Sequence, residues 1–170
     1  MRVMNSGDGW VAIVIVVTVL FAAIIIGVAV YFRVAKQTEL DETLEQLAAG
    51  TKAMTPEEFF ELRNYSFGGQ GRPKYAKTKN FEGVYILHNK TKDLYYIGQA
   101  KKILDRVNNH FTGKGNGDVY ADYKYGDKFV IRMIALEGSG FESLNELERN
   151  MIAKYDAVSK GYNKTKGNRN

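Results

Sequence analysis

The sequence predicts an α+β fold in which a small, mainly antiparallel three-stranded sheet is flanked by helices. A single transmembrane helix and a helical juxtamembrane spacer precede this domain. Three observations support the prediction. An uncharged apolar run occupies residues 10–32. Two short runs rich in β-branched and aromatic residues, 83–88 and 94–98, flank a polar turn. A third apolar run, residues 128–136, is typical of a largely buried strand.

Residues 10–32 consist mostly of Val, Ile, Ala, Leu and Phe and contain no charged side chain. At about 1.5 Å per residue, a helix of this length spans a hydrocarbon core of about 30 Å. A buried core helix would show a polar stripe, and the apolar part of a signal peptide is usually shorter, about 7–15 residues. We therefore interpret residues 10–33 as a transmembrane helix with Trp10 and Tyr31 as interfacial anchors.

The charges beside this helix predict its orientation. The short flank of residues 1–9 carries Arg2 and Asp8, whereas Arg33 and Lys36 follow the helix. The positive-inside rule then predicts a single-pass membrane protein with a cytoplasmic C-terminal body. The chain has no cysteine, which excludes disulfides and Cys-based zinc sites and agrees with that location.

Residues 34–64 are predicted to form a helical, acidic juxtamembrane spacer. Residues 36–49 have leucines at helical spacing and either continue the membrane helix or form a separate one. A capping box, Thr55 to Glu58, starts a second helix through Arg63. Its phenylalanines, Phe59 and Phe60, are expected to pack on the following domain or on a partner chain. A protein partner could thus bind residues 36–63.

The charge changes sign after this spacer. Residues 37–61 contain seven acidic side chains and one lysine, a balance that anionic headgroups and nucleic acid would repel. Residues 65–80 form a basic, glycine-containing linker in which Lys74 and Lys77 could contact phosphates. A solvated linker that is merely basic is the alternative.

The helix predicted for residues 101–111 places Arg106 and His110 on one face, four residues apart. Together with the preceding hairpin, this segment resembles the GIY-YIG nuclease family. The matching residues are Gly83-Val84-Tyr85, then Tyr96-Ile97-Gly98 after ten intervening residues, then Arg106 and His110. Val84 stands where the family name has isoleucine. Residues 96–111 are also similar to a segment of the excision-repair incision subunit, and the resemblance, which extends to the homing endonucleases of the family, covers residues 81–163.

The rest of the domain can be interpreted from local patterns. Residues 113–117 form a glycine-rich loop that lacks the spacing of a nucleotide-binding P-loop. A short helix is expected over residues 118–125. A capping-box pattern at Ser143 opens a helix to about Tyr155, with Glu148 just beside its apolar stripe. Residues 164–170 form a basic tail.

The resemblance implies a catalytic role for several of these residues. Tyr85 and Tyr96 would line the cleft, with Tyr85 a candidate to accept the proton of the attacking water, and His110 would relay a proton or orient the water or phosphate. Arg106 would stabilise the negative charge that develops on the phosphate, and Glu148 would hold one Mg²⁺ or Mn²⁺. The supporting residues are Asn163, Gly83 and Gly98. Gly98 would let the backbone turn tightly at the end of the strand. The candidate nucleic-acid contacts are Lys101, Lys102, Lys114, Lys74 and Lys77.

The sequence therefore predicts a membrane-anchored, divalent-metal-dependent endonuclease that acts on DNA and uses no small-molecule cofactor. A membrane-tethered nucleic-acid-binding module, with lost or partner-dependent cleavage, is the alternative. In a third interpretation, residues 36–63 serve as an interaction scaffold, which could coexist with the first.

Overall fold

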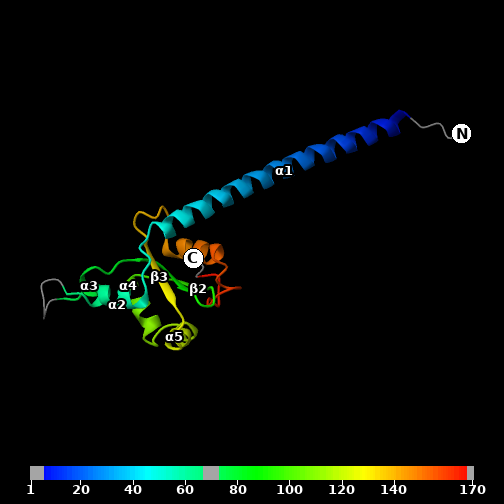
Figure 1. The fold of residues 1–170 in the computed structure, drawn as a ribbon. Helices are drawn as coiled ribbons and strands as arrows, with labels where there is room; N and C mark the ends of the chain where they lie inside the picture. The colour runs from blue at the N-terminus through cyan, green and yellow to red at the C-terminus, as the bar shows by residue number, and fades with distance from the viewer. Residues whose placement is uncertain (1–5, 67–72, 168–170) are drawn as a thin grey trace. The chain divides into compact units, whose positions relative to one another are not determined.

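The computed structural model describes residues 6–66 and 73–167, drawn in colour in Figure 1. The chain divides into two compact units, Met1–Thr43 and Leu44–Asn170. The second unit contains all the strands of the described residues and begins within the segment that the sequence analysis assigns to the juxtamembrane spacer. Its elements, in chain order after the end of α1, are α2 (Pro56–Asn64), α3 (Tyr75–Thr78), β1 (Gly83–Asn89), β2 (Leu94–Ala100), α4 (Ile103–Phe111), α5 (Gly117–Lys124), β3 (Phe129–Ala135) and α6 (Leu144–Lys154).

The first helix, α1, runs without interruption over Ser6–Ala49. The predicted membrane helix and the helix predicted for residues 36–49 are therefore one element. Large apolar side chains from Trp10 to Val34 are exposed along it. The hydroxyl of Thr18 donates to the carbonyl of Val14 at 2.7 Å, so this polar group is satisfied inside the helix. By length and composition, α1 holds one segment able to cross a membrane.

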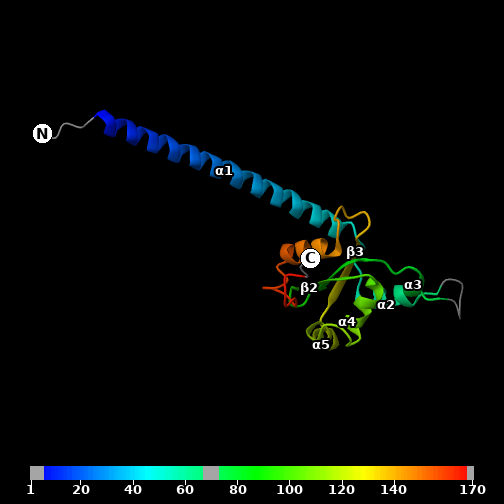
Figure 2. The ribbon, with the colours of Figure 1, turned by 180° about the vertical axis from the view of Figure 1, so that it is seen from behind.

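The second helix, α2, begins at the predicted capping box. The Thr55 hydroxyl accepts the N–H of Glu58 at 3.3 Å, and the Glu58 carboxylate accepts the N–H of Thr55 at 2.8 Å. Phe59 is fully buried in the core of the second unit, and Phe60 packs against the same cluster. This confirms the expectation that the two phenylalanines pack on the following domain. The short helix α3 packs beside α2 in the views of Figures 1 and 2, and the Tyr75 N–H donates to the carbonyl of Tyr65 at 2.7 Å.

The sheet has the order β2-β1-β3, and both pairings are antiparallel. The predicted three-stranded antiparallel sheet is confirmed, with the GVY strand in its centre. Tyr85 pairs with Gly98 on one side and with Met133 on the other. Because side chains alternate along a strand, Tyr85 and Leu87 share one face and Val84 and Ile86 the other.

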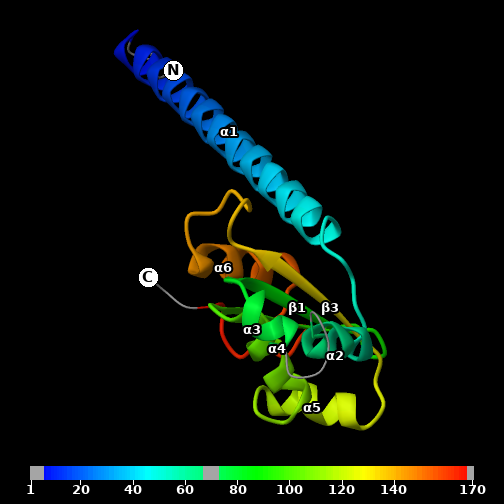
Figure 3. The same cartoon turned by 90° about the vertical axis from the view of Figure 1, so that its left-hand side faces the viewer.

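Helices cover both faces of this sheet (Figure 3). On the face of Tyr85 and Leu87, a core cluster includes Phe59 of α2 together with Leu104 and Val107 of α4. On the opposite face, α6 lies across β1 and β2. Because every β1 side chain except that of His88 is buried, this strand is the rigid centre of the domain.

The segment before α2 also belongs to this packing. Met54 forms an antiparallel bridge with Ile131 of β3, with N–H···O distances of 3.0 and 2.7 Å. The Arg132 guanidinium donates to the carbonyls of Ala48 and Thr51 at 3.0 and 2.7 Å. These long-range hydrogen bonds satisfy backbone groups that are buried or half-buried. Residues 44–54 are thus held against the β3 side of the sheet.

Candidate active site

The two motif tyrosines lie on the same face of the sheet. Tyr85 is buried in the centre of β1, and Tyr96 is half-buried on β2, with ring centroids 6.2 Å apart. Gly98 lies two residues after Tyr96 on β2, where it pairs with Tyr85. A Cβ on Gly98 would overlap the Tyr85 hydroxyl, so only glycine leaves room for that group. Gly98 is therefore inside a strand, and the tight turn expected at this position is wrong.

Helix α4 adds the predicted arginine and histidine to the same face. Its apolar side chains, Ile103, Leu104 and Val107, are buried against the sheet and fix its rotation. His110 is then fully buried with its ring centroid 4.8 Å from that of Tyr96. Arg106, one turn earlier on the same helix, is exposed to solvent. Four predicted residues thus meet at one place.

The Tyr85 hydroxyl is the centre of this group. Its oxygen lies 2.9 Å from Nε2 of His110, and the Arg106 side chain also hydrogen-bonds it. On the other side of the His110 ring, Nδ1 accepts the backbone N–H of Asn116 at 2.9 Å. A neutral imidazole carries one N–H, so this bond places the hydrogen on Nε2. The tyrosine oxygen therefore receives two N–H donors.

Burial controls the protonation of both residues. It raises the pKa of the Tyr85 hydroxyl well above its ordinary value; Tyr96 adds to this rise, and the hydrogen bond from Arg106 offsets part of it. Burial, followed by the charge of Arg106, lowers the pKa of His110 to about 4. At neutral pH, His110 is uncharged and Tyr85 keeps its proton. The imidazole therefore serves as a hydrogen-bond donor and not as a cation.

Glu148 of α6 approaches from the other face of the sheet, at the edge formed by β2. It is only 8% exposed, and its Oε2 accepts the Nε2–H of Gln99 at 2.9 Å. Gln99 points to the face opposite Gly98 because the two are neighbours along β2. The carboxylate is nonetheless close enough to Tyr85 to contribute to the rise in the pKa of that hydroxyl. The predicted catalytic residues thus lie on both faces of the sheet near β2, with Glu148 on one face and the other four on the opposite face.

The donors present are compatible with a hard divalent cation. In the described part of the chain, no group of three or more His, Cys, Asp and Glu side chains is placed to hold a metal. Mg²⁺ needs no such cage, since one or two carboxylates suffice when waters and phosphate oxygens complete its shell. The buried carboxylate of Glu148 fits that role.

The supporting residues act on the backbone of the strands. The Asn163 side chain accepts the N–H of Ile97 at 2.9 Å and donates to the carbonyl of Ile97 at 2.7 Å. It therefore pairs with β2 as a neighbouring strand would, between Tyr96 and Gly98. Gly83 allows β3 to approach, because a Cβ there would overlap the carbonyl oxygen of Ile134.

The five lysines predicted to contact nucleic acid are all exposed but lie on different elements. Lys101 and Lys102 immediately precede α4, four to five residues before Arg106. Lys114 lies in the loop after α4. Lys74, which donates to Asn64 at 3.3 Å, and Lys77 flank or lie on α3. Lys101, Lys102 and Lys114 therefore lie in the chain segments that flank α4, whereas Lys74 and Lys77 belong to another element.

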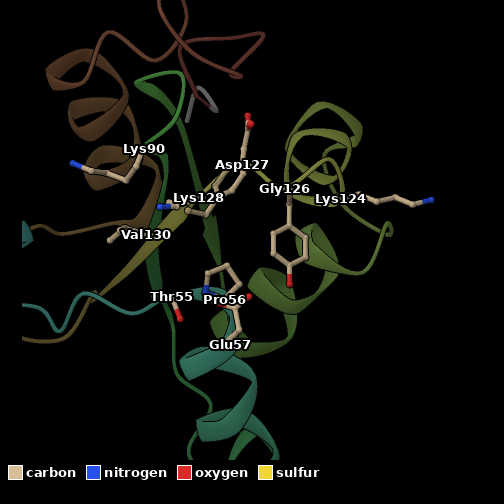
Figure 4. Close-up of a pocket in the computed structure, with 11 residues that line it drawn as sticks. Thr55, Pro56, Glu57, Lys90, Lys124, Gly126, Asp127, Lys128 and Val130 are labelled. Atoms are coloured by element: carbon tan, nitrogen blue, oxygen red, sulfur yellow. The ribbon is translucent and has the colours of Figure 1, made fainter.

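A separate hollow of about 720 Å³ lies between the start of α2, α5 and the loop before β3. None of the predicted site residues lines it. Its lysines do not converge on a common point, because Figure 4 shows Lys90 and Lys124 pointing to opposite sides. This arrangement does not favour the hollow as an anion site.

Sequence reasoning did not identify three residues that contact the site. Gln99 and Asn145 form a chain to Glu148, with Gln99 Nε2 2.6 Å from the Asn145 oxygen. Asn116 contacts His110 through its backbone N–H, which no side-chain pattern can reveal. The one local signal was for Asn116 as a helix cap, because its side chain accepts the N–H of Val119 at 3.0 Å.

Comparison with protein families matches residues 81–163 to the GIY-YIG catalytic domain. Comparisons with curated proteins and with solved structures give no match. The matched range begins two residues before β1 and ends at Asn163, so it includes all the strands of the described sheet, the arginine and histidine of α4, and Glu148.

Proposed function

Because the domain of residues 81–163 belongs to the GIY-YIG family of catalytic domains, we propose that this protein is a membrane-anchored endonuclease that hydrolyses DNA phosphodiester bonds with the help of a divalent metal ion. The observation that supports this most directly is the Tyr85 oxygen, which receives hydrogen bonds from Arg106 and His110. An oxygen held by two N–H donors, one of them permanently charged, is suited to carry negative charge for a moment in a reaction.

In the proposed reaction, the oxygen of a water molecule attacks the phosphorus while the ionised Tyr85 oxygen takes a proton from that water. The phosphorus–oxygen bond to the leaving sugar breaks, and the released oxygen takes a proton from solvent. Arg106 stabilises the charge on the phosphate oxygens as well as the Tyr85 phenolate. Glu148 would hold Mg²⁺ or Mn²⁺, which supplies further neutralisation of the phosphate and of the leaving oxygen.

The role of His110 follows from its protonation. Because Nε2 already carries a hydrogen, the ring cannot take the proton of Tyr85, and it stabilises the phenolate by donating to it. Tyr96 forms the wall beside the imidazole, with centroids 4.8 Å apart, and keeps the ring in place. Asn163 holds the β2 backbone that carries Tyr96.

A plasmid-nicking assay on the full chain in detergent, with and without Mg²⁺ or Mn²⁺, tests the activity. We expect Arg106→Ala and Arg106→Lys both to lose about 100-fold or more in rate, because lysine cannot form the forked contact. Glu148→Gln should abolish the response to metal, whereas Glu146→Gln on the same helix should not. Salt-sensitive DNA binding without cleavage under both metals would instead support a tethered binding module.

The membrane anchor is the second part of the proposal. It is supported by the apolar segment of α1, by its exposed large apolar side chains and by Arg33 and Lys36 after the run. The cysteine-free chain allows a clean test with single cysteines and a membrane-impermeant maleimide. We expect Ser6→Cys to react from outside intact cells and Thr165→Cys to react only after permeabilisation. Loss of the N-terminal residues from the mature chain would instead identify a signal peptide.

A further inference from the structure

The loop between α4 and α5, residues 113–117, closes over the His110 ring. Gly115 lies directly against it, because a Cβ at this position would overlap both Nδ1 and Cα of His110. The next residue, Asn116, donates its backbone N–H to Nδ1 at 2.9 Å. Two consecutive residues therefore contact the same imidazole: Gly115, which has no space for a side chain, and Asn116, whose N–H points at Nδ1.

The position of this N–H is fixed from both sides. The Lys114 N–H donates to the carbonyl of Asn109 at 2.9 Å, which ties the loop to the end of α4. The Asn116 side chain caps α5 by accepting the N–H of Val119 at 3.0 Å. Lys114 is thus bound to the end of α4, and the Asn116 side chain is bound to the start of α5. The Asn116 N–H therefore has little freedom to turn away from the ring.

Resting on the function proposed above, we propose that this glycine loop is a positioning element: Gly115 and the Asn116 N–H hold His110 in the Nε2–H tautomer, so that His110 donates a hydrogen bond to the Tyr85 oxygen. The opposite tautomer would present a bare Nε2 to Tyr85. That nitrogen would attract the phenol hydrogen and would offer nothing to the phenolate. The loop thus decides whether His110 supports or opposes ionisation of the reacting oxygen.

The tautomer can be measured independently of catalysis. The chain contains only two histidines, His88 and His110, so a ¹⁵N-histidine-labelled sample of the full chain in micelles gives a simple long-range ¹H–¹⁵N spectrum. A His88→Gln sample assigns the remaining signals to His110. We expect one ring nitrogen of the His110 pair to carry hydrogen, namely Nε2. A dominant Nδ1–H form would overturn the proposal.

Two variants at position 116 test the contact with Nδ1. Asn116 has a φ of −73°, which proline can adopt, so Asn116→Pro removes the N–H and places its Cδ toward Nδ1, where the contact cannot form, whereas Asn116→Ala keeps it. Both lose the side-chain cap equally. We expect the Nε2–H population to fall roughly tenfold relative to Nδ1–H in the proline variant alone, the size of one lost hydrogen bond. Nicking should fall about tenfold below that of the alanine variant.

Position 115 offers a second comparison. Gly115→Ala should displace the loop from His110 and change the tautomer populations, whereas Gly117→Ala, where a Cβ meets nothing within 4 Å, should leave the spectrum and the nicking rate unchanged. Wild-type spectra in both Asn116→Pro and Gly115→Ala would overturn the proposal. If the full chain cleaves nothing but its tautomer responds as expected, the proposed nuclease function fails and the positioning role of the loop stands.

Discussion

At the scale of single residues, Tyr85 and His110 share a hydrogen bond of 2.9 Å in a site that favours the uncharged form of both. Burial raises the pKa of Tyr85 and lowers that of His110 to about 4. The proposed reaction needs the tyrosine ionised, so the resting protein holds its base in the inactive form. In the proposed reaction, the two N–H donors and a cation held by Glu148 would reduce this cost.

The first prediction concerns the pH dependence of cleavage. Because the pKa of Tyr85 is raised, the phenolate fraction should grow tenfold for each pH unit below that pKa. We expect the logarithm of the nicking rate to rise with pH with a slope near one from about pH 6 to 9. Tyr85→Phe should lose roughly 100-fold or more in rate and this slope. Tyr95→Phe, on the opposite face of β2, should keep both.

The second prediction concerns stability in acid. The pKa of His110 is about 4 in the folded chain, against 6.5 for a histidine in an unfolded chain. Between these two pH values the unfolded state therefore binds more protons. The free energy of unfolding should therefore fall as the pH drops from 6.5 to 4, by up to about 3 kcal/mol. Chemical denaturation at several pH values measures this. His110→Gln should lose this contribution, whereas His88→Gln should retain it.

Gly98 shows what the sequence could and could not predict for a single residue. The motif spacing drew attention to this glycine, but the expected turn was wrong because the constraint comes from another strand. The Tyr85 hydroxyl occupies the space of a Cβ on Gly98. Likewise, residue types placed His110 beside Arg106, but its tautomer depends on a backbone N–H six residues later. Contacts of that kind exist only after the loop has folded.

At the scale of elements, local signals predicted the helices well and long-range pairing poorly. The Thr55 cap forms as expected, and the Ser143 hydroxyl accepts the N–H of Glu146 at 3.2 Å, because both depend on residues three apart. The bridge between Met54 and Ile131 joins segments far apart in sequence, and no pattern in either segment indicates the other. The side-chain pairing of Asn163 with β2 is of the same kind.

The third prediction tests that pairing. Asn163→Ala removes both hydrogen bonds to Ile97 and leaves half-buried backbone groups without them. We expect the free energy of unfolding to fall by about 1–3 kcal/mol and the nicking rate to fall with it, because Tyr96 loses its fixed backbone. Lys164→Ala removes only an ion pair with Asp118 in which both side chains are exposed, so it serves as the control. Equal stability of the two variants would contradict the role of Asn163.

At the scale of the whole molecule, the compact unit is larger than the family domain. The family match covers residues 81–163, but the unit extends from Leu44, and α1 is continuous from Ser6 to Ala49. Leu44, Ala48 and Met54 are buried in it. The sequence predicted an acidic spacer over residues 34–64. A charge count does not reveal that a few buried apolar side chains are enough to attach such a segment to a sheet.

The last prediction follows from Phe59, which is 0% exposed within the core cluster that also contains Tyr85. A fragment that begins at residue 44 should unfold cooperatively and cleave DNA without detergent. A fragment that begins at residue 73 lacks Phe59 and the Met54 bridge, and should be unfolded or inactive. Phe59→Ala in the longer fragment should lower the free energy of unfolding by about 3–5 kcal/mol. Phe60→Ala, at a half-buried neighbour, should cost less. If the shorter fragment matches the longer one in melting temperature and nicking rate, residues 44–66 are dispensable cover, and catalysis depends on the family domain alone.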